Sequence, residues 1–487
     1  MPIAHTSSLL ERILVAGVLC LLLWLPLPLG SNRDWAAGIL VLACGMLALG
    51  WALAEWRGLL GHNSHRTLRV ARNLLCLLLA SQAWVALQWL AGLSSDNGAT
   101  FTSLLLGLSY CLLFLLTVSL FNTRKRLTLL LATLVVSGTL QAFWGSFMTL
   151  SGIEWLLAGP KTYGIGVASG TFVNRNHLAG YLEMTLACGI GLLLALRDGR
   201  PFNWVNLLEL LLGPKARLRL ALVVMVIALV LTRSRSGNSA FFISLLFTGG
   251  LFVLLERTHR LRNGLILGSI ILIDVLVISQ YFGLEQLGER LASTRLSAET
   301  AVGSAAQPAT EDRPEVFGHA LPLLREHPLT GMGAGSFEAV FPRYAGPEIR
   351  EHFNHLHNDY LQFVIEYGVL GSLPLAAFVL LALWQALRAL WQRQSAYRSG
   401  VGFGAAMGII ALLIHSATDF NLQIPANAAT FIVLCAIASL AASHSHPHRR
   451  HAQAQPAPVS GTPGPETRRK TPASDPAALK SARRPGS

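Results

Sequence analysis

Long apolar stretches recur along most of the chain, and they restrict its fold more than any other feature of the sequence. An α-helix needs about 20 mostly apolar residues to cross the hydrocarbon core of a bilayer. Only 13% of the residues are charged and the mean hydropathy is +0.50, which excludes an ordinary soluble domain. The sequence therefore predicts an all-α integral membrane protein with about 12 transmembrane helices. The expected spans are 13–30, 35–54, 70–91, 101–121, 127–150, 177–196, 218–232, 238–255, 264–283, 359–387, 401–416 and 426–443.

The loops between the expected spans alternate in basic charge. Arg124, Lys125 and Arg126 lie in one basic loop, and similar groups occur in every second loop and in the tail. By the positive-inside rule these loops are cytoplasmic, so both termini are expected in the cytoplasm. The net charge of +13 then reflects membrane topology. No basic stretch is interleaved with aromatic residues as a nucleic-acid groove requires, so no nucleic-acid partner is expected.

Two segments differ in composition from the apolar spans. Residues 284–357, between the ninth and tenth spans, form one large polar segment, which the alternation of loops predicts to be periplasmic. Residues 444–487 are rich in Pro, Ala, Ser and Arg without apolar periodicity, which predicts a disordered, basic cytoplasmic tail. The membrane domain, including the periplasmic loop over the expected site, then covers residues 1–443.

The richest polar motif is His355-Leu-His-Asn-Asp-Tyr-Leu-Gln362, which closes the large loop and leads into the tenth span. A neutral histidine has an unperturbed pKa of about 6.5 and can take the proton of a hydroxyl group. If the helix already includes His355, four residues share one helical face, and His357 points elsewhere. Spacing alone does not decide which histidine is the base, and Asp359 is a further candidate catalytic residue of this motif. The four residues on that face are His355, Asp359, Gln362 and Glu366, and Asn358 lies beside them.

A second polar cluster marks the start of the sixth span. Arg175 and His177 lie at the expected membrane surface, and Asn176, Gly180 and Glu183 share one helical face. Glu183 is nearly two turns into the membrane, where an ionisable group is a functional candidate. The alternative is a carboxylate that a neighbouring helix neutralises.

Several arginines occur on the side that is otherwise poor in them. The turn Thr232-Arg-Ser-Arg-Ser-Gly237 contributes Arg233 and Arg235, and Arg313 begins a predicted amphipathic helix. Guanidinium groups match the paired oxygens of diphosphate, so we favour anion binding over snorkelling to lipid headgroups. Asp419 and Asn421, after the eleventh span, face the same side. Asp274, within the ninth span, has no evident partner.

Arginines beside a possible base suit displacement of an anionic leaving group by a hydroxyl nucleophile. Zinc bound by His355 and His357 is the rival interpretation, but the positive surroundings disfavour a dication, and we expect no metal. The glycines at 331, 333 and 335 resemble a phosphate-binding loop only superficially, because no strand precedes them. A tight turn that seats the large loop on the membrane domain is the better interpretation.

Five motifs together resemble the O-antigen ligase and polymerase superfamily, over about residues 130–443. The resemblance is carried by Gly170-Thr-Phe-Val-Asn-Arg-Asn-His-Leu-Ala-Gly-Tyr-Leu182, Arg233-Ser-Arg-Ser-Gly237, His327-Pro-Leu-Thr-Gly-Met-Gly333, His357-Asn-Asp-Tyr-Leu-Gln-Phe-Val-Ile-Glu-Tyr-Gly-Val-Leu-Gly371 and His415-Ser-Ala-Thr-Asp-Phe-Asn-Leu-Gln-Ile-Pro-Ala-Asn427.

The resemblance implies a metal-independent, cofactor-free glycosyltransferase of the bacterial inner membrane, surrounded by membrane lipids. Such an enzyme moves a glycan from undecaprenyl diphosphate to an acceptor on the periplasmic face, with inversion at the anomeric carbon. His357 matches the proposed base, and Arg233 or Arg235 together with Arg313 match the arginines that hold the diphosphate. Arg175 lies in a motif shared by part of the family.

The resemblance leaves the acceptor open. We expect ligase-type transfer to lipid A-core, with the growing glycan (an O-antigen or exopolysaccharide polymerase) or a protein as alternatives. An anion transporter, such as a bicarbonate transporter, is the rival from another class. A transporter is expected to show inverted repeats and polar groups near the bilayer midplane, whereas the polar residues here gather at one face.

Overall fold

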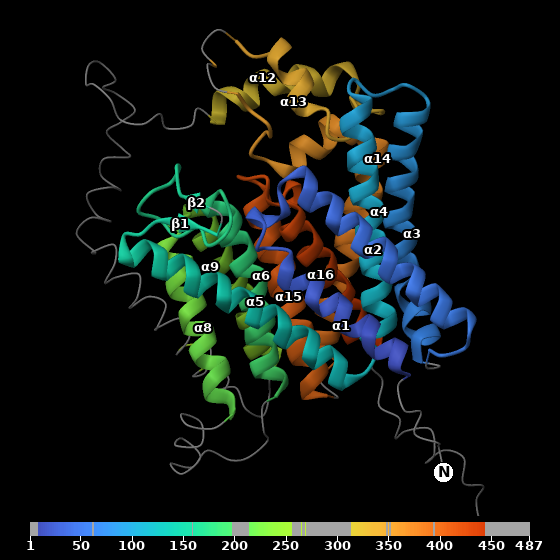
Figure 1. The fold of residues 1–487 in the computed structure, drawn as a ribbon, viewed down its shortest axis with the longest axis vertical. Coiled ribbons are helices and arrows are strands. Elements are labelled where there is room, and N and C mark those ends of the chain that lie inside the picture. Colours follow the sequence, from blue (N-terminus) through green and yellow to red (C-terminus); the bar gives the residue numbers. More distant parts are fainter. Residues whose placement is uncertain are drawn as a thin grey trace, which may run out of the picture. The chain divides into compact units, whose positions relative to one another are not determined.

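The computed structural model describes residues 8–60, 63–157, 159–196, 214–255, 264, 268, 313–346, 349, 352–392 and 395–443. Its described part is almost entirely α-helical, and nine of its helices are long and apolar enough to cross a membrane (Figure 1). The predicted all-α membrane protein is confirmed at this level. These helices are α2 Asp34–Trp56, α3 Asn63–Leu90, α4 Asn97–Leu120, α5 Arg124–Ser151, α6 Arg175–Ala195, α9 Arg235–Leu255, α14 Asp359–Trp391, α15 Ala396–Ser416 and α16 Pro425–Ser443.

Two further helices overlap expected spans: α1 Leu9–Trp24 and α8 Pro214–Leu231. The remaining elements are α12 Arg313–Glu326, α13 Phe337–Val340, the 3₁₀ turns η1 Leu29–Ser31, η2 Phe341–Arg343 and η3 Asn421–Gln423, and a two-stranded pairing of β1 Trp155–Leu156 with β2 Gly159–Pro160. Apart from residues 264 and 268, the expected ninth span with Asp274 lies outside the described residues, as do residues 284–312 and the tail from 444.

The first expected span, 13–30, is wrong at both ends. Helix α1 begins earlier, because the Ser8 hydroxyl accepts a hydrogen bond from the Glu11 backbone N–H and caps it. It ends at Trp24, before Pro26 and Pro28, because proline lacks the N–H that continues a helix and restricts the residue before it.

Helices α6 and α15 form the buried centre of the bundle. Every residue of α6 from Asn176 to Ala195 is buried, and α15 packs against α6, α14, α16 and α9. The two helices cross with their backbones in contact: a Cβ on Gly191 would lie 2.7 Å from the Cα of Gly404. Small residues at such a crossing allow the close approach typical of membrane helices. The crossing brings the start of α6 and the end of α15 to the same end of the bundle.

Helix α14 begins where predicted and carries the glycine turn of the large loop. The Asn358 side chain caps its first turn by accepting from the Leu361 N–H at 3.0 Å. Gly368, with φ 63°, interrupts the helix, and the loop docks at this break. There the Met332 N–H donates to the Ile365 carbonyl at 2.9 Å. The expectation that this segment is a tight turn seated on the membrane domain is therefore confirmed, with α12 and α13 beyond it (Figure 1).

The docking turn makes a specific stability prediction at Gly331. Its φ of +70° disfavours other residues, and a Cβ would lie 2.3 Å from the Glu366 carbonyl oxygen. Gly331→Ala should lower the free energy of unfolding by at least about 1 kcal/mol. Gly318→Ala is the matched control, because a Cβ at this helical position meets nothing within 4 Å and alanine favours helix. Thermal unfolding in detergent measures both, and equal melting temperatures for Gly331→Ala and wild type would contradict the prediction.

Candidate active site

The carboxyl group of Asp419 lies at the centre of the predicted polar residues. It follows α15 and is fully buried. One oxygen, Oδ1, accepts from the Phe420 N–H at 2.8 Å, and the other accepts from the Asn176 side chain of α6. His177 Nε2 and His357 Nδ1 lie 3.7 and 3.8 Å from Oδ1. Asp419 therefore joins α6, the turn after α15 and the segment before α14.

Asp419 is a carboxylate in this environment. Burial on its own raises the pKa of the carboxyl group, but the His177 and His357 imidazoles beside it have the larger combined effect. They hold the pKa of Asp419 well below its usual range. A carboxylate at this position favours an Nδ1–H on His357 that faces it, which leaves Nε2 of that ring as the acceptor.

Phe420 packs against all three histidines of the cluster. Its ring centroid lies 4.6 Å from that of His177 and 4.7 Å from those of His355 and His357. His357 itself adopts a left-handed backbone conformation, with φ 57°. Such a conformation costs free energy in a non-glycine residue, and it is maintained here by the surrounding packing. The three rings, one from α6 and two from the segment before α14, pack against the same aromatic ring.

A side chain of α14 contacts His355, although His355 itself precedes that helix. The helix begins at Asp359, so the condition for a helical face that includes His355 is not met. The loop still brings the ring to α14, where Gln362 Nε2 lies 3.1 Å from His355 Nδ1. The same amide nitrogen donates to Glu366 Oε1 at 3.0 Å. Gln362 and Glu366 thus share a helical face as predicted, and the loop supplies the histidine.

Glu366 connects this arrangement to the glycine turn. Its Oε2 accepts from the Gly335 N–H at 2.9 Å, and its Oε1 accepts from the Phe337 N–H at 3.4 Å. Both Glu366 and Gln362 are almost completely buried. All the contacts of this carboxylate are donors, which satisfies its oxygens inside the protein.

The oxygens of Asp359 hold the turn that carries Asp419. Its Oδ2 accepts from the Ser416 hydroxyl at 2.8 Å and from the Leu422 N–H at 3.0 Å. The neighbouring Asn358 side chain donates to the Ala417 carbonyl at 3.0 Å. These contacts fix the turn between α15 and α16 against the start of α14.

Glu183 has a partner that sequence reasoning missed. His415 Nδ1 lies 2.8 Å from Glu183 Oε1, and both side chains are fully buried. The alternative interpretation of Glu183 required a partner on a neighbouring helix, and that helix is α15. The predicted face of α6 is also present, because Gly180 packs against the Asn421 side chain. His415 had a sequence signal of its own, as a titratable residue inside an apolar span.

The predicted arginines occupy helix starts, and their side chains project outward. Arg175 is the first residue of α6 and Arg235 the first of α9, and both are exposed, as is Arg233 with φ 50°. A Cβ on Gly237 would lie 3.0 Å from Glu183 Oε1, so the arginine turn adjoins α6. Arg313 begins α12, but its side chain lies outside the described part of the chain.

Helices α6, α9, α14 and α16 begin at this end of the bundle. Each helix start presents unpaired N–H groups and the positive end of a helix dipole. Such ends favour anions, and each of these helices carries or follows a predicted site residue. Among the described residues, no group of three or more His, Cys, Asp or Glu side chains is arranged to hold a metal ion.

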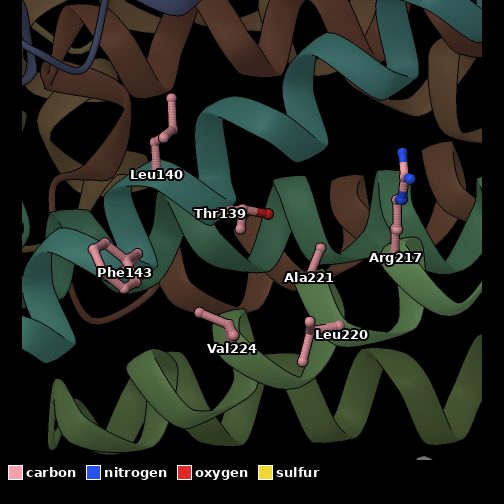
Figure 2. Close-up of a pocket in the computed structure, with 7 residues that line it drawn as sticks. All are labelled: Thr139, Leu140, Phe143, Arg217, Leu220, Ala221 and Val224. Carbon is pink, nitrogen blue, oxygen red and sulfur yellow. The ribbon is translucent and has the colours of Figure 1, made fainter.

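An open groove of about 300 Å³ lies elsewhere, between α5 and α8 (Figure 2). Its lining is apolar except for Thr139 and Arg217, and it includes none of the predicted site residues. The side chains that line it are Thr139, Leu140, Phe143, Arg217, Leu220, Ala221 and Val224.

The fold and the site define a multi-pass α-helical membrane protein with a buried cluster of titratable groups at one end. The model of the O-antigen ligase family matches residues 220–376, from α8 into α14. This match covers about a third of the chain and supports the superfamily that the motifs indicate. No curated protein matches the chain.

The environment of His355 predicts how stability depends on pH. Burial and the neighbouring His177 and His357 imidazoles lower the pKa of His355 to about 4, against an opposing effect of Asp419. A histidine in the unfolded chain has a pKa of about 6.5. Between about pH 4 and about pH 6.5 the unfolded chain therefore binds a proton at this residue, whereas the folded protein does not. Stability should therefore fall as the pH drops from about 6.5 towards about 4.

Thermal unfolding across this pH range measures the effect. His355→Gln should lose less stability on acidification than the wild type does. His352→Gln is the control, because His352 is exposed and pairs with Glu338 at 2.8 Å, outside the cluster. The same acid dependence in His355→Gln and wild type would contradict the assignment.

Proposed function

We propose that this protein is an inverting glycosyltransferase that moves a glycan from undecaprenyl diphosphate to lipid A-core. The reaction takes place on the periplasmic face of the bacterial inner membrane, without a metal ion or cofactor. The observation that carries the proposal is the His357 imidazole 3.8 Å from the buried Asp419 carboxylate. The family match supports the class of enzyme, and the exposed arginines support an anionic leaving group.

His357 acts as the general base. Its Nε2 accepts the proton of the acceptor hydroxyl while the hydroxyl oxygen attacks the anomeric carbon. The bond from that carbon to the diphosphate breaks, and the diphosphate leaves with the bonding electrons. Asp419 orients the ring through Nδ1–H and stabilises the imidazolium that forms. The histidine geometry thus supports His357 over His355 as the base.

The leaving diphosphate binds at the helix starts beside the cluster. Arg175, Arg233 and Arg235 provide charge there, with Arg313 from the large loop. Guanidinium groups pair with diphosphate oxygens in two parallel hydrogen bonds, and the N-termini of α6 and α9 add N–H donors. In a partly dehydrated site these groups stabilise the charge that develops in the transition state.

Asp359, which the motif suggested as a catalytic residue, has a positioning role in this proposal. Its oxygens are engaged by Ser416 and the Leu422 N–H. Asp419 takes the place beside the base. The His415–Glu183 pair beneath it supports the same turn by tying α15 to α6.

In vitro transfer from a synthetic undecaprenyl-diphosphate oligosaccharide tests the function. Wild type should add one glycan to lipid A-core, and His357→Gln should lower kcat by about 10²- to 10⁴-fold, the contribution of a general base. His352→Gln is the matched control and should keep wild-type activity, because the exposed His352 is outside the cluster.

Lipid A-core and the growing glycan are offered side by side, as acceptors, to each variant. A ladder of glycan lengths without a lipid A product would replace the ligase by a polymerase. No consumption of the lipid-linked donor by the wild type with any acceptor would refute a transferase and return attention to anion transport. Full activity of His357→Gln would remove His357 as the base.

The arginine turn predicts a separate effect on donor binding. Arg235→Lys and Arg233→Lys keep the charge but lose the paired donors, so each should raise KM for the lipid-linked donor about tenfold. Arg217→Lys is the control, because Arg217 lies in the groove between α5 and α8. Steady-state kinetics at fixed acceptor concentration measure the change. Unaltered KM in both lysine variants at the turn would contradict paired binding of diphosphate there.

A further inference from the structure

The orientation of the Gln362 amide is fixed by the backbone. The Leu356 N–H, which can only donate, lies 3.1 Å from Gln362 Oε1, so this atom is the amide oxygen. The other amide atom is therefore nitrogen, and it donates both to Glu366 Oε1 at 3.0 Å and to His355 Nδ1 at 3.1 Å. Glu366 reinforces this assignment, since its carboxylate accepts backbone N–H groups from the glycine turn.

The amide in turn fixes the tautomer of His355. Nδ1 accepts a hydrogen bond, so the proton of the neutral ring is on Nε2. Within the described part of the chain, Nε2 makes no hydrogen bond. The lowered pKa of His355 keeps the ring neutral at physiological pH. The adjacent His357, with Asp419 at its Nδ1, has the opposite arrangement, with an acceptor at Nε2.

We propose that His355 donates a hydrogen bond from Nε2–H to an oxygen of the leaving diphosphate, an inference that rests on the proposed function. A donor aimed at the attacking hydroxyl oxygen would lower its nucleophilicity. A donor aimed at the leaving group stabilises the charge that develops as the bond to the anomeric carbon breaks. The two histidines then divide the chemistry: His357 removes a proton and His355 stabilises an anion.

Gln362 is the positioning residue in this arrangement. It is almost completely buried, and its amide is held at three points, by Leu356, Glu366 and His355. Because Glu366 is bound by the Gly335 N–H, docking of the glycine turn on α14 supports the same amide. The donor tautomer of His355 thus depends on a chain of contacts that begins in the extramembrane loop.

Binding of undecaprenyl diphosphate to the purified full-length protein tests the inference without turnover. His355→Phe preserves an aromatic ring against Phe420 but removes the N–H, and should weaken the affinity about ten- to a hundredfold, the range of a hydrogen bond to a charged group. His355→Gln supplies an amide N–H and should bind more tightly than His355→Phe. His352→Phe is the matched control and should bind as wild type does.

A second variant tests the tautomer. Gln362→Glu presents a carboxylate to Nδ1, so the proton of His355 moves to Nδ1 and Nε2 becomes an acceptor. This variant should lose diphosphate affinity as His355→Phe does, with the histidine still present. Nitrogen-15 chemical shifts of the labelled protein report the tautomer directly, and a wild-type His355 with its proton on Nδ1 would overturn the inference.

The outcomes separate this inference from the proposed function. If wild type binds undecaprenyl diphosphate and His355→Phe binds it equally well, the role of His355 is refuted while the transferase stands. If wild type binds no undecaprenyl diphosphate and consumes no donor, the proposed function fails first. Affinity that rises steeply between pH 8 and pH 6 in wild type but not in His355→Phe would show a cationic His355 and overturn the neutral donor.

Discussion

A buried carboxylate with several partners organises this protein. Asp419 lies in a turn at the end of the bundle, and its charge requires hydrogen-bond donors once it is removed from water. Those partners come from α6 through Asn176 and His177, and from the segment before α14 through His357. Satisfying one charge therefore brings together three parts of the chain that are far apart in sequence.

The bundle makes this gathering possible because α6 and α15 approach each other at glycine. The contact of Gly191 with Gly404 removes the side-chain layer that normally separates two helices. At the other end of the same helix pair, Glu183 and His415 make a buried hydrogen bond at 2.8 Å. Each of these titratable groups would be costly to bury unpaired in an apolar interior. As a pair, they join the two helices that carry the site.

The two histidines of one short motif show how environment separates chemically identical side chains. Asp419 faces Nδ1 of His357, whereas the Gln362 amide donates to Nδ1 of His355. A carboxylate and an amide N–H favour opposite protonation of that nitrogen, so one ring is prepared as a base and the other as a donor. The division follows a general pattern, in which neighbouring titratable groups acquire different roles through their surroundings.

The sequence by itself determined the helices and the end of the bundle at which the polar residues gather. Apolar runs of about 20 residues have few alternatives to membrane helices, and the starts of α6 and α14 follow from polar residues that cap helices. The sequence also predicted the shared face of Asn176, Gly180 and Glu183, because helical periodicity is local. Only the tertiary structure decided the partners: His415 for Glu183, Asp419 for His357 and Gln362 for His355. These contacts join distant segments, or a loop to a helix, and no spacing rule within one helix encodes them.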